Sequence, residues 1–234
     1  MNYQELFSQI QTYTENQFPD TFVQVSSSGS QTNVNATTQI NTFIMQAEDR
    51  IYNTVQIPSL RKNVTGNVSS TSKYLACPND YLSTYSLAII KADGSYEYLL
   101  NKDVNFIRQS YPDPTATGLP RYYALFGSRL NDPNELTFIL GPTPDATYGA
   151  ELHYFYYPAS IVTAGTSWLG DNYSPVLLYG ALVEAYTYMK GEADMLAAYN
   201  AKYNEAMQQL NRLGTGLERG DAYRDGQAKI RVNP

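Results

Sequence analysis

The residues best suited to acid–base chemistry in this 234-residue sequence surround its only histidine, His153. If the run from Glu151 to Tyr157 is a β-strand, Glu151, His153 and Phe155 share one face, because side chains alternate along a strand. A Glu–His pair can orient a general base. However, no Ser, Cys or metal-ligand pattern nearby completes a catalytic set. The sequence therefore favours a structural role for His153.

Other reactive residue types also lack a catalytic context. The single cysteine, Cys77, has no nucleophile signature around it, and it excludes both an intrachain disulfide and a cysteine-based metal site. We expect it to be a small buried hydrophobe. Four aspartates lie in turn-like contexts, where Asp is common for its own backbone hydrogen bonds: Asp103, Asp113, Asp132 and Asp145. We predict no catalytic residue, no cofactor and no metal.

Adjacent charges at Glu48, Asp49 and Arg50 fall on a segment with helical periodicity. Neighbouring residues on a helix point about 100° apart, so the two carboxylates would not converge on one substrate atom. We interpret these charges as a solvated helix face or an intersubunit salt bridge.

The strongest helical signal runs from Trp168 to Leu213. Ser174 followed by Pro175 predicts a helix start in which the serine hydroxyl caps the helix and proline occupies the first turn. Gly191 separates this helix from a second one, which predicts a helical hairpin with apolar faces that need a partner. We expect the second helix to pack between subunits through Leu196, Tyr199, Tyr203 and Leu210.

The N-terminal part predicts two further helices, at residues 3–18 and 37–55, separated by an exposed polar loop from Gln24 to Asn35. From residue 61 onward the periodicity becomes strand-like, and Asp93-Gly94 marks a hairpin. The predicted strands are 73–76, 86–90, 96–100, 104–108, 121–126, 136–140 and 150–157.

This order predicts an α+β fold in which an antiparallel β insertion interrupts a four-helix core. We assign residues 1–60 to the N-terminal helices, 61–160 to the insertion, 161–213 to the C-terminal helical hairpin and 214–234 to an extended tail. The tail is rich in glycine and charge, so we expect it to order only on a partner.

Composition limits the partners. A net charge of −6 argues against a protein that grips DNA phosphates. The sequence shows neither a membrane span nor a secretory leader, which predicts a cytoplasmic protein. The 22 tyrosines suit either half-buried strands or an interaction surface, and the sequence leaves both interpretations open.

Several phrases, in this order, resemble the head-to-tail adaptor (connector) proteins of short-tailed bacteriophages. The resemblance covers residues 39–213. It rests on the runs Glu48–Tyr52, Cys77–Leu82, Gly118–Ala124 and Leu177–Ala185, the last preceded by Trp168-Leu169.

The resemblance implies a structural virion protein of the podovirus tail or neck that has no enzymatic activity and is assembled in the host cytoplasm. It implies a homo-oligomeric ring, usually a dodecamer, that binds the portal protein and the tail nozzle or tail fibre proteins. DNA would pass through the ring during ejection without specific binding. The C-terminal tail would dock on the portal, and we expect its contacts at Tyr223, Arg224, Lys229, Ile230 and Arg231.

A second hypothesis is a β-rich binding module, directed at carbohydrate or protein, that is monomeric. Its platform would be built from exposed tyrosines: Tyr122, Tyr123, Tyr154 and Tyr156.

Overall fold

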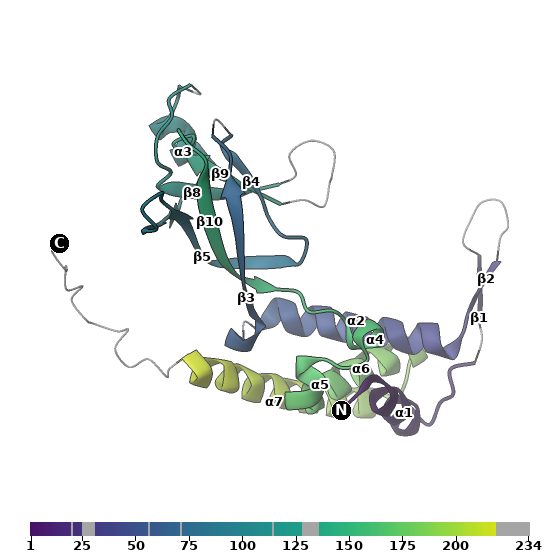
Figure 1. Ribbon diagram of the computed structural model, residues 1–234. Coiled ribbons are helices and arrows are strands. Elements are labelled where there is room, and N and C mark those ends of the chain that lie inside the picture. Colours follow the sequence, from purple (N-terminus) through teal and green to yellow (C-terminus); the bar gives the residue numbers. More distant parts are fainter. Residues whose placement is uncertain are drawn as a thin grey trace. The chain divides into compact units, whose positions relative to one another are not determined.

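The chain forms two compact units. Residues 1–58 and 158–234 form one, called here the helical unit, and Ser59–Tyr157 form the other, called the β unit. The computed structural model describes residues 1–19, 21–24, 31–55, 57–70, 72–113, 115–127 and 136–218 (Figure 1). The fold is α+β, as predicted.

One apolar helix forms the middle of the helical unit. This helix, α6, contacts α1, α2, α5 and α7, and its buried residues include Val176, Leu177, Ala181 and Leu182. A helix that is apolar on most sides must be covered on most sides, so the amphipathic helices pack around it. The elements of this unit are α1 (Tyr3–Thr14), β1 (Thr21–Gln24), β2 (Gln31–Val34), α2 (Ala36–Thr54), α4 (Ile161–Ala164), α5 (Trp168–Asn172), α6 (Ser174–Met189) and α7 (Ala193–Glu218).

The hairpin between α6 and α7 is built differently from our prediction. Helix α6 begins at Ser174, but no side chain caps it, so the predicted serine cap is wrong. The chain reverses at Lys190, which adopts the left-handed conformation with φ of 53°. The neighbouring Gly191 is needed for space, because a Cβ atom there would lie 2.6 Å from the Tyr186 ring.

Two further segments of the helical unit differ from prediction. The polar stretch 24–35 was predicted to be a loop, yet Thr21–Gln24 and Gln31–Val34 pair as an antiparallel hairpin. The Ser/Gly-rich composition of this stretch gave no sign of the two short strands. Residues 25–30 lie outside the described residues. Helix α7 continues to Glu218, five residues beyond the predicted end at Leu213.

The β unit contains two four-stranded sheets. The first has the order β3-β10-β5-β6, and the second has the order β4-β9-β8-β7. The 3-10 helix η1 (Pro58–Leu60) begins one residue before the first residue of this unit. The other elements of the unit are β3 (Arg61–Val68), β4 (Tyr74–Ala76), β5 (Tyr81–Ile90), β6 (Tyr96–Tyr98), β7 (Leu100–Asn101), α3 (Val104–Ser110), β8 (Tyr122–Phe126), β9 (Thr137–Gly141) and β10 (Tyr148–Tyr156). The hairpin predicted at Asp93-Gly94 joins β5 to β6 and is confirmed.

The prediction of a wholly antiparallel insertion is wrong at one strand pair. The chain leaves β6 in the first sheet and enters β7 in the second, and β7 pairs with β8 in parallel. A parallel pair needs a crossover, and helix α3 lies in it. Residues 104–108 were predicted to be a strand, but Asp103 starts a helix there by accepting a hydrogen bond from the Asn105 N–H at 2.7 Å.

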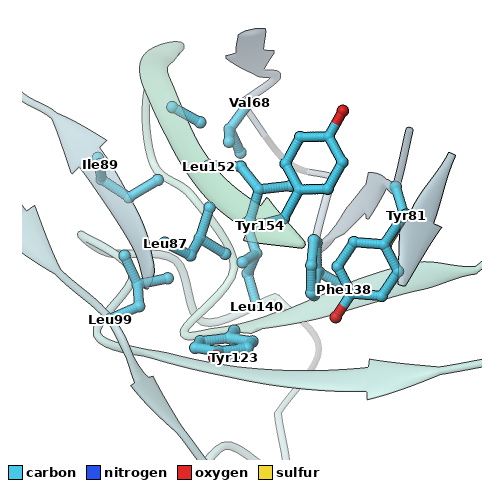
Figure 2. Close-up of a cluster of buried hydrophobic side chains, with 12 residues drawn as sticks. Val68, Tyr81, Leu87, Ile89, Leu99, Tyr123, Phe138, Leu140, Leu152 and Tyr154 are labelled. Atoms are coloured by element: carbon cyan, nitrogen blue, oxygen red, sulfur yellow. The ribbon is translucent and has the colours of Figure 1, made fainter. Parts of the chain in front are cut away.

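The core of the β unit lies between facing side chains of the two sheets. Leu87, Leu152 and Tyr154 come from the first sheet, and Phe138 and Leu140 from the second (Figure 2). Cys77 belongs to this cluster, as predicted for a small buried hydrophobe.

A charged pair flanks this core. The Tyr154 hydroxyl donates to Asp80 at 2.8 Å, and Lys62 Nζ donates to the other oxygen of the same carboxylate at 2.6 Å. Burial and the Asp80 carboxylate raise the pKa of Tyr154 to about 12. The buried phenol ring therefore carries a polar tip that reaches a charged partner.

Candidate interaction surfaces

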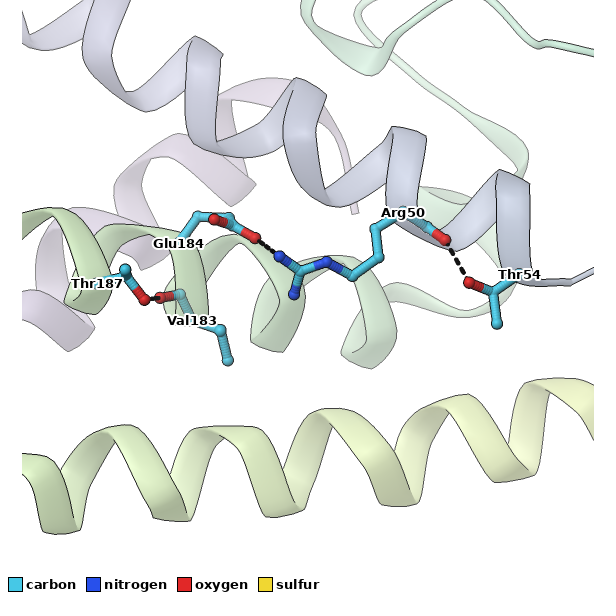
Figure 3. A network of polar contacts seen from close by, with 5 residues as sticks. All are labelled: Arg50, Thr54, Val183, Glu184 and Thr187. Atoms are coloured by element: carbon cyan, nitrogen blue, oxygen red, sulfur yellow. Dashed lines mark hydrogen bonds and ion pairs between the residues drawn. The ribbon is translucent and has the colours of Figure 1, made fainter.

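An ion pair joins two helices of the helical unit. Arg50 on α2 donates to Glu184 on α6 (Figure 3). The guanidinium carbon of Arg50 also lies 5.8 Å from the centre of the Tyr203 ring on α7. The pair is formed within one chain, where the sequence had left a solvated face or an intersubunit salt bridge as the alternatives. The sequence feature that could have indicated this ion pair is Glu184, because it is a charged residue within an otherwise apolar helical stripe and so needs a partner.

Glu48, two residues before Arg50 on α2, is buried and not solvated as predicted. One carboxylate oxygen accepts the Ile161 N–H at 2.9 Å and so holds the start of α4, while the other has no hydrogen-bond partner. Burial raises the pKa of Glu48, although the hydrogen bonds from Ile161 and Ser160 oppose that effect. Glu48 is therefore a packing residue of this unit.

The stripe predicted to pack between subunits is largely occupied within the chain. Tyr199, Tyr203 and Leu210 are buried, and Leu196 is half-buried. The Tyr199 ring lies 4.9 Å from that of Tyr186 on α6. Intrachain packing therefore covers these side chains, because α6 and α7 cover each other along the hairpin.

The opposite face of α7 is exposed. Ala197, Ala201, Asn204 and Gln208 recur at helical spacing, and each is solvent-exposed. At a rise of about 1.5 Å per residue, the 26-residue helix is about 39 Å long. Within the described residues this is a long helical surface of small and polar side chains.

The predicted tyrosine platform is not formed. Tyr123 and Tyr154 are buried in the core of the β unit, whereas Tyr122 and Tyr156 are half-buried. The tyrosines exposed on this unit are others, Tyr85, Tyr96 and Tyr98. Strand alternation accounts for the difference between the neighbours Tyr122 and Tyr123 on β8. It does not account for the difference between Tyr154 and Tyr156, because the register of β10 against β5 shifts before Tyr154 and again before Tyr156.

His153 and Glu151 lie next to each other without forming a tight pair. Their closest nitrogen–oxygen distance is 3.9 Å, and Glu151 instead accepts the Asn63 amide at 2.7 Å. Ser86 Oγ lies 3.4 Å from His153 Nδ1, at the far limit of a hydrogen bond. Across the ranges that the structure describes, no group of three or more His, Cys, Asp or Glu side chains could hold a metal ion.

None of the helices described is both long and apolar enough to cross a membrane. The predicted portal-docking residues, which are Tyr223, Arg224, Lys229, Ile230 and Arg231, lie outside the described residues.

Comparison with known proteins identifies the family of this chain. No curated protein matches the chain. A family model described as SU10 adaptor protein matches residues 1–231, which is nearly the whole chain. The chain therefore belongs to the SU10 adaptor protein family and is a phage adaptor protein.

Proposed function

We propose that the chain is a structural, non-enzymatic head-to-tail adaptor that forms a ring between portal and tail and surrounds the DNA exit channel. The family match over residues 1–231 carries this proposal. The resemblance to adaptors of short-tailed phages supports the podovirus-type assignment, the ring and the usual count of twelve copies.

The exposed face of α7 is our proposed subunit contact. Alanines at 197 and 201 allow a neighbouring helix to approach closely, and the polar residues that follow can hydrogen-bond across the contact. This assignment replaces the stripe of Tyr199, Tyr203 and Leu210, which the chain itself covers.

An acidic protein suits a channel that must release DNA. A net charge of −6 repels phosphates and so disfavours tight DNA binding. The proposed channel therefore conducts DNA without holding it.

The test of the ring is the mass of the purified chain, alone and with the phage's own portal protein, by size exclusion with light scattering. We expect a species many times larger than 26.2 kDa in at least one sample. The double variant Ala197→Arg and Ala201→Arg should abolish it, whereas Ala92→Arg in the exposed β5–β6 turn should not. A monomer in both wild-type samples would refute the ring.

Portal docking by the tail is tested by truncation. The cut belongs after Glu218, because α7 reaches that residue and Gly214 is buried. We expect the truncated chain to remain folded and to lose attachment to portal. Unchanged attachment would refute the docking role of the five predicted tail residues.

A further inference from the structure

The second sheet of the β unit has two unlike faces. Along β9, Phe138 and Leu140 point into the core between the sheets, so Thr137 and Ile139 lie on the outer face. Helix α3 packs on this outer face through Ile107. With seven residues α3 is about 10 Å long, whereas the five-residue strand β9 spans about 17 Å. The helix therefore covers only part of the face (Figure 1).

A pocket of about 160 Å³ lies beside α3 on this face. It is lined by Tyr74, Val104, Arg108, Phe126, Gly127, Thr137 and Ile139. A cavity of about 150 Å³ is large enough to hold a benzene molecule. The pocket can therefore accept one aromatic ring or one branched apolar side chain.

One polar atom in this apolar wall lacks a partner. Thr137 is only 3% exposed, and its hydroxyl makes no hydrogen bond. The hydroxyl oxygen is itself buried, so a ligand atom in the pocket cannot reach it at hydrogen-bond distance, and we expect Thr137 to offer the pocket only apolar contact.

The mouth of the pocket carries a positive charge that the described part of the chain does not neutralise. Arg108 is exposed, and no carboxylate among the described residues pairs with it. Lys73 and Arg108 also line an adjoining cavity. The one carboxylate among the residues lining that cavity, Asp113, accepts hydrogen bonds from the N–H and hydroxyl of Thr115 through Oδ1, and its single negative charge faces the two positive charges of Lys73 and Arg108. A ligand with a negative charge is therefore favoured.

We propose that this pocket docks an acidic segment of a partner protein by taking in one aromatic or branched side chain. The side chain fills the space between Tyr74, Phe126 and Ile139, and a neighbouring carboxylate of the partner pairs with Arg108. The inference depends on the proposed adaptor function in one respect, namely that the partner is a protein.

The test uses methyl NMR on the full chain, which remains feasible if the chain forms a large ring. The observed methyl groups are those of Val104 and Ile139, which line the pocket. The probes are phenylacetate and phenethylamine, which share a ring and differ in the sign of their charge. We expect saturable shifts with phenylacetate and about tenfold weaker binding of phenethylamine, a difference of about 1.4 kcal/mol.

Variants test the contribution of the Arg108 charge. Arg108→Gln should weaken phenylacetate binding about tenfold and remove the preference for the anion. Thr137→Val should leave it unchanged, because the Thr137 hydroxyl is buried. Arg121→Gln is the matched control, because Arg121 is an exposed arginine of the same unit that does not line this pocket, and it should change nothing.

Three results would overturn the inference. They are equal binding of both probes, shifts confined to methyl groups elsewhere, and unchanged affinity in Arg108→Gln. A final arm tests the class of partner with an acetylated, amidated tripeptide of Asp, Phe and Glu. If phenylacetate binds and the tripeptide does not, the pocket takes a small molecule and the proposed protein partner is wrong. A monomer in the light-scattering experiment would refute the ring without altering any of these results.

Discussion

The two units differ in how deeply their carboxylates are buried. In the helical unit, ionisable side chains lie within the packing between helices, where Arg50 meets Glu184 and where Glu48 holds the start of α4. In the β unit, the core is dominated by aromatic and aliphatic side chains, and the charged pair of Asp80 and Lys62 remains partly exposed. Both units have apolar cores, but the carboxylates of Glu48 and Glu184 lie deeper in the packing of the helical unit than the Asp80 carboxylate does beside the core of the β unit.

The difference appears in two carboxyl groups. Burial raises the pKa of Glu48. Partial burial also acts to raise the pKa of Asp80, but the hydrogen bonds from Lys62 and Tyr154 prevail and lower it. Acidification should therefore relieve the free-energy cost of burying the charged Glu48 carboxylate in the helical unit. In the β unit it should weaken the stabilising contact that the Asp80 carboxylate makes with Lys62 and Tyr154.

The largest expected effect is on the core of the β unit. Phe138 is fully buried, and the rings of Tyr81 and Tyr123 meet it edge-on at 5.7 and 5.5 Å. Phe138→Ala should cost about 4 kcal/mol, because it removes this packing and leaves a cavity. Hydrogen exchange should show the loss in residues 59–157 and little change in the helical unit.

The control for this prediction is Phe126→Ala. Phe126 is 55% exposed, so its loss should cost under about 0.5 kcal/mol. If Phe138→Ala deprotected both units equally, the two cores would be one cooperative structure and the comparison would fail.

The second prediction concerns the polar packing of the helical unit. Arg50 is 44% exposed, but Glu184 is only 15% exposed, so removing the arginine leaves a largely buried carboxylate without its partner. A double-mutant cycle with Arg50→Gln and Glu184→Gln should give a coupling of about 1 kcal/mol from chemical denaturation. The same cycle on Lys202 and Glu205, both about 60% exposed, should give almost none.

Sequence reasoning located the long helices because their apolar periodicity persists over many residues. Residues 37–55 and 174–190 were predicted to be helices, and α2 and α6 begin and end within one residue of those limits. Short elements carry less of this signal. The segment 104–108 has a strand-like composition, and only the cap at Asp103 and the crossover between sheets make it a helix.

The partners of the buried side chains could not be read from periodicity. A stripe such as that of Tyr199, Tyr203 and Leu210 shows that a helix face is covered, but not whether the cover is the same chain or another. For Glu48 the sequence left a solvated face or an intersubunit salt bridge open, and its observed position depends on the N–H of Ile161, more than a hundred residues away. The pocket beside α3 was missed because the helix that forms its edge was missed.

The third prediction uses the opposite pKa shifts, beginning with Glu48. Because its pKa is raised in the folded state, wild-type stability falls as pH rises from about 4.5 through the folded pKa. Glu48→Gln should keep the hydrogen bond to Ile161 without the charge. We expect its Tm at pH 7 to rise by about 2–4 °C, corresponding to about 1 kcal/mol.

The gain should vanish below about pH 4, where Glu48 is protonated in both the folded and unfolded states. Calorimetry at pH 7 and pH 3.5 measures both values. Glu192→Gln, at an exposed position of the same unit, is the control for removing one carboxylate charge. A destabilised Glu48→Gln at pH 7 would mean that the charge of Glu48 is needed in the folded state.

The smallest effect is expected for Asp80→Asn. The carboxylate is one-third exposed, so its loss should cost under about 1 kcal/mol at pH 7. A lowered pKa means that the contribution is present above about pH 4 and is lost as pH falls through the folded pKa. The stability of Asp80→Asn and wild type should therefore converge on acidification, as measured by hydrogen exchange in residues 59–157. Lys62→Met removes the same ion pair through its other partner, so its loss of stability relative to wild type at pH 7 should also shrink as the pH falls. If both variants remained less stable than wild type at low pH, the effect would come from packing and not from charge.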